Sequence, residues 1–228
     1  MRPLERALWK GDVEAVLLHL GDAGERDPQG MTGLMYSAIY GHMDCVKLLL
    51  KSEGGCQKDN GWTALMYAAA HDHPELIREL SPREARLSNK YGWTALMQAA
   101  YRGHLDCVRA LLCELSLQTT QEWNGCPVGA SALIIAAIFN RGSIVSVLMT
   151  YERDIVDAEG RDALWHALHN ARDETGALIP TGHLEVINAL RAQSTRQPSP
   201  VKIPPSMIQS FKRQMEGSIS SVTSSNTP

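Results

Sequence analysis

Apolar residues recur along this chain in short, helix-length runs separated by turn residues. The stretch 90–112 shows the pattern most clearly: residues 95–100 are strong helix formers whose apolar side chains share one face. Gly103 interrupts that run, and valine and leucine then fall at helical spacing over residues 105–112. Thr94 stands before the first run, where its hydroxyl can accept a hydrogen bond from a free backbone amide. The pattern predicts a turn followed by two short antiparallel helices.

One phrase opens every predicted unit. Gly-Trp-Thr-Ala-Leu-Met occupies residues 61–66 and again residues 92–97, and weaker copies begin at Gly30, Gly129 and Gly160. The leading glycines are therefore 31, 31, 37 and 31 residues apart. A fixed period of this length predicts a solenoid, in which each unit buries its apolar face only against its neighbours. Such a solenoid presents a long surface to other macromolecules.

The second predicted helix of the units carries apolar residues in a common register. Val46, Val108 and Val145 each fall fourteen residues after the capping threonine or serine of their unit. A leucine pair, or Leu-Met in one unit, follows three residues later. This agreement predicts one continuous core that the stacked units share.

These residues resemble ankyrin repeats, whose usual phrase has a glycine, a threonine two residues later, a pair of alanines, and Gly-His before the second helix. Gly-His pairs stand here at residues 41–42, 103–104 and 182–183. The resemblance covers residues 4–191 and implies an all-α ankyrin-repeat solenoid of stacked helix-turn-helix units with short hairpin loops. We expect about six units within residues 1–191, of which the first and the last are irregular.

Methionine replaces the histidine of the usual ankyrin phrase in three units, at Met35, Met66 and Met97. The resulting Thr-Ala-Leu-Met phrase is similar to the ankyrin-only families expanded in diplomonad protists, some of whose members also carry a kinase domain. Methionine cannot make the side-chain hydrogen bond that usually ties the threonine. We therefore expect the threonine cap to act alone.

Two segments interrupt the period. Six extra residues lie within residues 113–128, and eleven extra residues separate Ala171 from the region of the last Gly-His pair. Within the second segment, residues 173–180 predict a protruding loop. Asp72 and Asn140 replace the glycine that ends the first helix in other units, and a left-handed residue is expected at both positions.

The composition changes abruptly after Arg191. Residues 192–228 are rich in serine and proline and predict a disordered tail. Residues 206–215 place methionine, isoleucine and phenylalanine at helical spacing and could fold onto a partner. Ser199 precedes Pro200 in the form that a proline-directed kinase accepts, and it is a candidate phosphosite. Phosphate there would add about −1.5 to −2 charge to a basic tail.

Charge and cysteine content exclude several classes of function. The formal net charge is −3, without the basic cluster that nucleic acid requires. The five cysteines are odd in number and lack a C-x-x-C pair, so we expect neither disulfides nor a zinc site. No apolar run approaches the roughly 18 residues of a membrane helix. We predict an intracellular, cytoplasmic protein, compatible with a cytoskeletal association, that engages no nucleic acid, membrane or small-molecule substrate.

The residue between the glycine and the capping threonine is the first candidate for partner contact. In the ankyrin architecture this position lies at the base of the hairpin and faces the concave groove, and here it holds Met31, Trp62, Trp93 and Arg161. Aromatic and arginine side chains anchor many interfaces. Neighbouring contact positions hold Tyr40, Tyr91, Tyr101, Arg102 and Phe139. The alternative, that the tryptophans only shield shortened hairpins, stays open.

Signals for catalysis and for cofactors are missing from the sequence. It has no glycine-rich phosphate loop, no nucleophile elbow and no kinase phrase. His166 and His169 lie three residues apart, so a metal could bridge them, but no third ligand is evident. We predict no catalytic residue, no metal site and no cofactor.

The prediction for function is a non-catalytic protein-protein interaction module, an adaptor or scaffold that binds a partner protein in the concave groove. The first alternative is a regulatory inhibitor that docks on an enzyme such as a kinase. A remote alternative is an enzyme whose site lies in the irregular segments 113–128 and 171–181. A pocket that brings polar groups of both segments together would support the enzyme, whereas the separation of these segments by a full unit argues against it.

Overall fold

The computed structural model describes residues 3–194, and these residues form paired helices. The first helix of each pair belongs to an inner row: α1 (Pro3–Lys10), α3 (Gly33–Tyr40), α5 (Ala64–Ala70), α7 (Ala95–Arg102), α9 (Ala132–Ile138) and α11 (Ala163–His169). The second belongs to an outer row: α2 (Val13–Leu18), α4 (Met43–Glu53), α6 (Pro74–Glu84), α8 (Leu105–Ala110), α10 (Gly142–Glu152) and α12 (Leu184–Ser194). Two short 3-10 helices, η1 (Leu20–Asp22) and η2 (Leu112–Glu114), follow α2 and α8.

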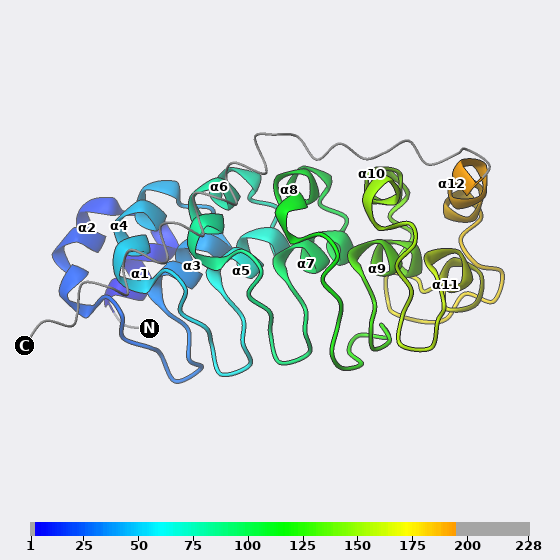
Figure 1. Cartoon of the computed structure of the whole chain (residues 1–228). Helices are drawn as coiled ribbons and strands as arrows, with labels where there is room; N and C mark the ends of the chain where they lie inside the picture. The colour runs from blue at the N-terminus through cyan, green and yellow to red at the C-terminus, as the bar shows by residue number, and fades with distance from the viewer. Residues whose placement is uncertain (1–2, 195–228) are drawn as a thin grey trace, which may run out of the picture. The chain divides into compact units, whose positions relative to one another are not determined.

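The pairs stack in the order of the sequence (Figure 1). Each inner helix packs against the next inner helix, from α1 to α11, and each outer helix packs against the next outer helix, from α2 to α12. Hairpin loops project from the inner row, on the side away from the outer row (Figure 1). The predicted all-α solenoid of stacked helix pairs is confirmed. The sequence prediction places Ser199 and residues 206–215 in a tail, and both lie outside the described residues.

The residues that the period aligns close one shared core. The aligned side chains are fully buried: Val46, Val108 and Val145, and three residues further on Leu49, Leu111 and Leu148. Neighbouring pairs supply the other walls of this core, because alanine and leucine of one inner helix pack against those of the next. The valine and leucine positions that align in the sequence are therefore the positions that pack in the shared core.

Side-chain caps begin the inner helices. Thr94 accepts a hydrogen bond from the Met97 amide at 3.5 Å, which confirms the predicted cap of α7. The same bond is made at α3, α5, α9 and α11 by Thr32, Thr63, Ser131 and Asp162. After α5 and α9, Asp72 and Asn140 adopt the left-handed backbone with φ of 59° and 56°, in place of the glycine used elsewhere.

A buried glutamate completes the cap, and Glu84 shows how. This last residue of α6 is 1 % exposed, and it accepts hydrogen bonds from the Leu65 amide at 2.6 Å and from the Gly55 amide at 3.1 Å. It also bonds the Thr63 side chain. The expectation that the threonine cap acts alone is wrong, because the glutamate supplies the second partner that the missing histidine would otherwise provide.

The same arrangement recurs along the solenoid. Glu53, Glu114 and Glu152 are buried, and each accepts a hydrogen bond from an amide in the first turn of its own inner helix, at 2.6 to 2.8 Å. The second carboxylate oxygen of each accepts from an amide that follows the preceding outer helix. Burial raises the pKa of Glu84, Glu114 and Glu152, and the hydrogen-bond donors offset this only in part. Each carboxylate ties its own helix pair to the pair before it.

A second repeated hydrogen bond joins neighbouring inner helices. Nε2 of His73 lies 3.0 Å from the Ile39 carbonyl oxygen, and the same nitrogen of His104 lies 3.2 Å from that of Ala70. His42 and His183 make the equivalent contact. In the fifth pair Arg141 takes this place, and its Nε donates to the Tyr101 carbonyl at 3.1 Å. The Gly-His phrase thus serves the stacking of the units.

The two irregular segments both fold into turns. Trp123 and Cys126 exchange backbone hydrogen bonds of 3.2 and 2.9 Å, and Asn124 and Gly125 between them have φ of 52° and 76°. Positive φ at both positions is the type I′ geometry that Asn-Gly favours. We call residues 122–127 the insertion hairpin. The second segment turns back through an isolated bridge between Arg172 and Leu178.

Candidate protein-binding groove

The predicted contact residues differ widely in exposure. Tyr40 and Arg102 are exposed, whereas Trp62, Tyr91 and Tyr101 are half-buried. All five come from inner helices or from the hairpins that precede them. They therefore lie on the side of the solenoid that the family resemblance assigns to the groove.

Three predicted contact residues are buried instead. Met31, Trp93 and Phe139 are 6 %, 0 % and 7 % exposed and belong to the apolar core. Their side chains have almost no surface to offer a partner. Burial therefore argues against direct partner contact by these three, and for Trp93 the cover comes from a residue outside the repeat.

The insertion hairpin covers Trp93. The indole of Trp123 meets the Trp93 ring edge-to-face, with centroids 4.8 Å apart, and it stacks on the Tyr91 ring at 5.1 Å and an interplanar angle of 4°. Its centroid also lies 6.5 Å from that of Trp62. The repeat pattern could not indicate this residue, because the insertion occurs once. The Asn-Gly pair that follows Trp123 was the available signal, since it is typical of a tight hairpin.

Five half-buried rings, linked by contacts among themselves and with the buried Trp93 ring, make up what we call the aromatic band: Trp62, Tyr67, Tyr91, Tyr101 and Trp123. Trp62 contacts Tyr67 at 4.8 Å, and Tyr101 reaches the band through the edge of the buried Trp93 ring at 5.7 Å. Aromatic pairs of this kind each contribute about 0.5–1.5 kcal/mol beyond their buried area. Contacts between the rings therefore fix the band within the chain itself.

Cations flank the band. Lys90 Nζ lies 4.9 Å from the centre of the Tyr91 ring, and the Arg102 guanidinium lies 5.7 Å from that of Tyr101. Both cations belong to exposed residues. An apolar centre with a charged rim is the usual anatomy of a protein interface.

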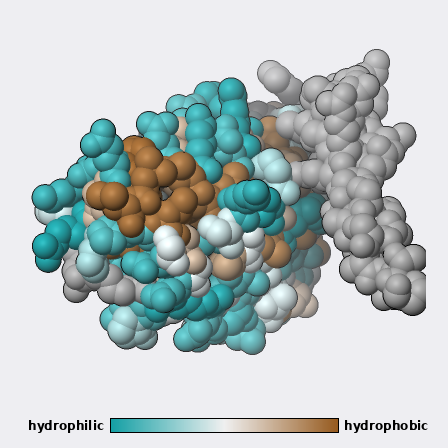
Figure 2. Space-filling view, turned by 90° about the vertical axis from the view of Figure 1, so that its left-hand side faces the viewer, coloured by the Kyte–Doolittle hydropathy of each residue, from teal (hydrophilic) through white to brown (hydrophobic). Residues whose placement is uncertain are grey.

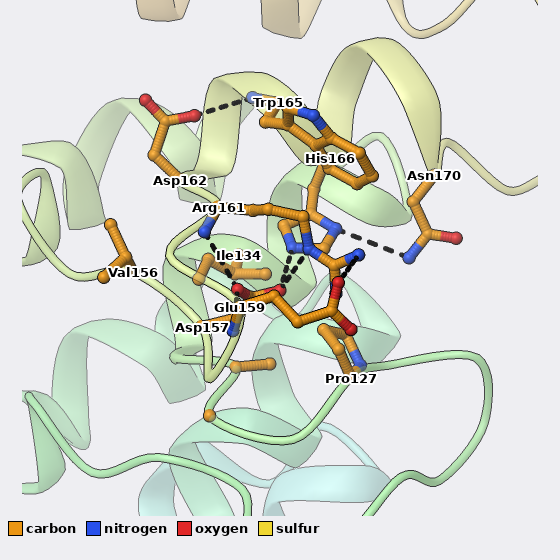
Figure 3. Close-up of polar contacts among 12 residues, drawn as sticks. Pro127, Ile134, Val156, Asp157, Glu159, Arg161, Asp162, Trp165, His166 and Asn170 are labelled. Atoms are coloured by element: carbon orange, nitrogen blue, oxygen red, sulfur yellow. Dashed lines mark hydrogen bonds and ion pairs between the residues drawn. The ribbon is translucent and has the colours of Figure 1, made fainter.

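The last hairpin is built around a buried carboxylate (Figure 3). Asp157 accepts hydrogen bonds from the amides of Glu159 and Arg161 at 2.9 Å, and its Oδ2 lies 2.8 Å from Arg161 Nε and 2.9 Å from His166 Nε2. Burial alone would raise the pKa of Asp157, but the donors of Arg161 and His166 outweigh it and hold the pKa below its usual value. This carboxylate fixes the hairpin to α11.

His166 and His169 do not converge on a metal position. His166 is fully buried against Asp157, and its Nδ1 lies 3.4 Å from the Asn170 amide nitrogen, so the ring is neutral with its proton on Nε2. Burial lowers the pKa of His166. The Nδ1 atom of His169 lies 3.0 Å from the carbonyl oxygen of Trp165. Within residues 3–194, no group of three or more His, Cys, Asp or Glu side chains could hold a metal ion.

A cavity of about 600 Å³ lies between the insertion hairpin and the last helix pair. The hairpin contributes Glu122, Trp123, Asn124, Gly125, Cys126 and Pro127, and the last pair contributes Glu159, Arg161, Trp165, His169, Asn170 and Arg172. Asn170 Nδ2 donates to the Gly125 carbonyl at 3.3 Å. The expectation that a full unit keeps the two irregular segments apart is wrong, because the hairpin bends across the fifth pair.

A buried thiol lines the cavity. Burial raises the pKa of the Cys126 thiol far above its usual value. A thiol that stays protonated is a weak nucleophile.

A separate apolar patch lies at the N-terminal end of the solenoid. Figure 2 faces the end that carries α2 and shows a hydrophobic area on its surface. Leu17 and Leu18 of α2 are 50 % and 83 % exposed, and Trp9 of α1 is also exposed. The patch is far along the row of pairs from the aromatic band, since α1 and α2 form the first pair.

Capped helix pairs that stack on a shared core define a helical-repeat solenoid, a class of fold that offers an extended surface for binding. A family model described as ankyrin repeats (3 copies) matches residues 4–88 and 55–122. The two matches together span residues 4–122, or 119 of the 228 residues. The chain belongs to the ankyrin-repeat family, whose repeats are generally protein-protein interaction modules and typically non-catalytic. No curated protein matches it. In residues 3–194 no helix has the length and hydropathy to cross a bilayer.

Proposed function

We propose that this chain is a non-catalytic adaptor or scaffold that binds a partner protein along the groove of inner helices and hairpins. The observation that carries the proposal is the aromatic band, in which five half-buried rings from two helix pairs and the insertion hairpin are linked by ring contacts. Large apolar side chains that gather at a protein surface often mark an interaction site.

The band suits an anchor role because its rings are already fixed. Tyr91 contacts both the stacked Trp123 ring and the Lys90 ammonium. Tryptophan and tyrosine bury large areas on binding, and rings that are ordered beforehand lose little further conformational entropy. A few such side chains usually supply most of the binding free energy. Lys90 and Arg102 would then add specificity from the rim.

Proximity labelling in cells that express the full chain tests this proposal. The test variant is Trp62→Ala with Tyr91→Ala, which truncates two half-buried rings of the band and leaves the buried Trp93 in place. The matched control is Tyr151→Ala, which removes an exposed ring of the outer helix α10. We expect the double variant to lose most labelled neighbours and the control to keep them. A double variant with unchanged helical circular dichroism and an unchanged set of neighbours contradicts the proposal.

The same experiment addresses the regulatory alternative. If a recovered partner is an enzyme, its turnover with and without the full chain separates an inhibitor from a scaffold. A cytoplasmic location is part of the proposal, and it is supported by the five cysteines, none of which forms a disulfide in the described structure. The Thr-Ala-Leu-Met phrase supports a relationship to the diplomonad ankyrin families, which is likewise a proposal.

A further inference from the structure

The cavity beside the insertion hairpin has an unusual distribution of charge. Two guanidinium groups, of Arg161 and Arg172, and two carboxylates, of Glu122 and Glu159, line it. Arg161 is compensated, because its Nε lies 2.8 Å from Asp157 and its NH1 lies 2.6 Å from Glu159. Within residues 3–194, Arg172 has no carboxylate at ion-pair distance. Arg172 therefore has no direct ion-pair partner among the described residues, and Glu122 is the lining carboxylate left to balance it at longer range.

Arg172 is also held in position. Its backbone amide donates to the Ile138 carbonyl at 2.8 Å, and its NH1 donates to the Gly176 carbonyl at 2.7 Å. Its Nε atom is buried without a hydrogen-bond partner. Gly125 of the insertion hairpin lies against the guanidinium, so closely that a Cβ at position 125 would fall 2.4 Å from Nε. A guanidinium that is held in place, with no carboxylate in direct contact, can bind an anion through its remaining donors.

The rest of the lining limits which anion fits. The indoles of Trp123 and Trp165 supply apolar surface, and Asn170 stands beside them. Glu122 and Glu159 face the same space and repel any anion, and this repulsion is about twice as large for a doubly charged phosphate as for a single carboxylate on a short aliphatic stem. The geometry favours a carboxylate with one negative charge.

We propose that this cavity binds an aspartate or glutamate side chain of the partner, with the carboxylate on Arg172 and the aliphatic stem between the indoles of Trp123 and Trp165. The inference rests on the proposed function, that the groove binds a protein. Trp123 belongs both to the aromatic band and to the cavity lining. One extended partner segment can therefore place apolar residues on the band and an acidic residue in the cavity.

The test is a titration of the full-length chain followed by ¹H–¹⁵N NMR at the tryptophan indole N–H groups. The probe is N-acetyl-glutamate N-methylamide, its uncharged control is N-acetyl-glutamine N-methylamide, and inorganic phosphate is the third arm. We expect the Trp123 and Trp165 signals to shift saturably with the glutamate probe only. The absence of a saturable shift up to 50 mM probe, or tighter binding of phosphate, overturns the proposal.

Variants of the arginine show whether it carries the binding. Arg172→Gln is expected to weaken the probe by about 10-fold or more, since a charge-assisted hydrogen bond is worth roughly 1.5–3 kcal/mol. Arg109→Gln, at an exposed residue of α8, is the matched control and should leave the dissociation constant unchanged. If Arg172→Gln loses its dispersed spectrum, Arg172→Lys serves instead, with an expected loss of about 3-fold or more. An unchanged constant in the folded variant refutes the assignment.

Failure of this proposal is distinguishable from failure of the proposed function. The probe titration measures the cavity with no partner present, so a negative result leaves the labelling experiment on Trp62 and Tyr91 standing. Conversely, probe binding that depends on Arg172 would survive even if truncation of the band left every neighbour in place.

Discussion

Replacement of Glu84 by alanine tests the role of the buried carboxylate in holding the solenoid together. The side chain accepts from the Leu65 and Gly55 amides and bonds Thr63, and it lies in a position with no access to solvent. Truncation leaves these donors without their acceptor, and each buried donor that loses its partner costs about 1–3 kcal/mol. With a small added cost for the space left behind, we expect a loss of about 3–5 kcal/mol.

Urea denaturation followed by circular dichroism at pH 7 measures this loss. Because the total free energy of unfolding of a domain is about 5–15 kcal/mol, the variant should retain only part of its stability. With a slope of about 1–3 kcal/mol/M in urea, the midpoint should fall by roughly 2 M. Glu79→Ala in the same helix is the control, since Glu79 is partly exposed, and it should change stability by less than about 1 kcal/mol. Equal midpoints for Glu84→Ala and the control would refute the reasoning.

Three further predictions follow from burial. Burial raises the pKa of Glu84, so the native state keeps this proton to a higher pH than the unfolded state does. The stability of the wild type relative to Glu84→Gln should therefore be greatest below about pH 4.5 and should fall as the pH rises through the native pKa. Urea denaturation across pH 4–8 measures this, and the opposite trend would contradict the prediction. Trp93→Ala should cost about 3–5 kcal/mol because the ring is fully buried, whereas Trp62→Ala should cost clearly less, and equal thermal midpoints would be inconsistent with the packing. Leu18→Lys should change the free energy of unfolding by no more than about 0.5 kcal/mol, since Leu18 is 83 % exposed; a larger loss in urea would show that the patch is packed.

The repeating part of the fold was predictable because the same physical need recurs in each pair. Thr94 as a cap and Val108 as a core residue follow from a period that aligns them with other units. The left-handed residues Asp72 and Asn140 follow in the same way, since each replaces a glycine at a fixed offset.

The buried glutamates were missed although they recur in the sequence. Glu53, Glu84, Glu114 and Glu152 follow a spacing close to that of the leading glycines. A glutamate near the end of an amphipathic helix usually faces solvent, so its position alone gave no reason to place it inside. The reason for their burial is seen only in the structure, where each carboxylate accepts a hydrogen bond from an amide of the preceding helix pair.

The burial of the predicted contact residues could be predicted only in part from the sequence. A tryptophan at the base of a hairpin is partly exposed when nothing lies across it, as at Trp62. At Trp93 the insertion hairpin supplies Trp123 as a cover, and that contact joins segments whose pairing no period encodes. The cavity around Arg172 arises from the same crossing and could not be derived from either segment alone.

The hydrogen bonds of Glu84 show that a structural unit of the solenoid begins earlier in the chain than the repeated sequence phrase does. The phrase starts at Gly61, but the hydrogen bonds of its helix pair reach back to Gly55. A shortened or recombined array that begins at Gly61 would therefore lack the Gly55 amide, and Oε1 of Glu84 would lose its hydrogen-bond donor. Cuts placed ahead of the Gly55 loop would preserve whole bonded modules, which makes that loop the better junction for engineering arrays of different length.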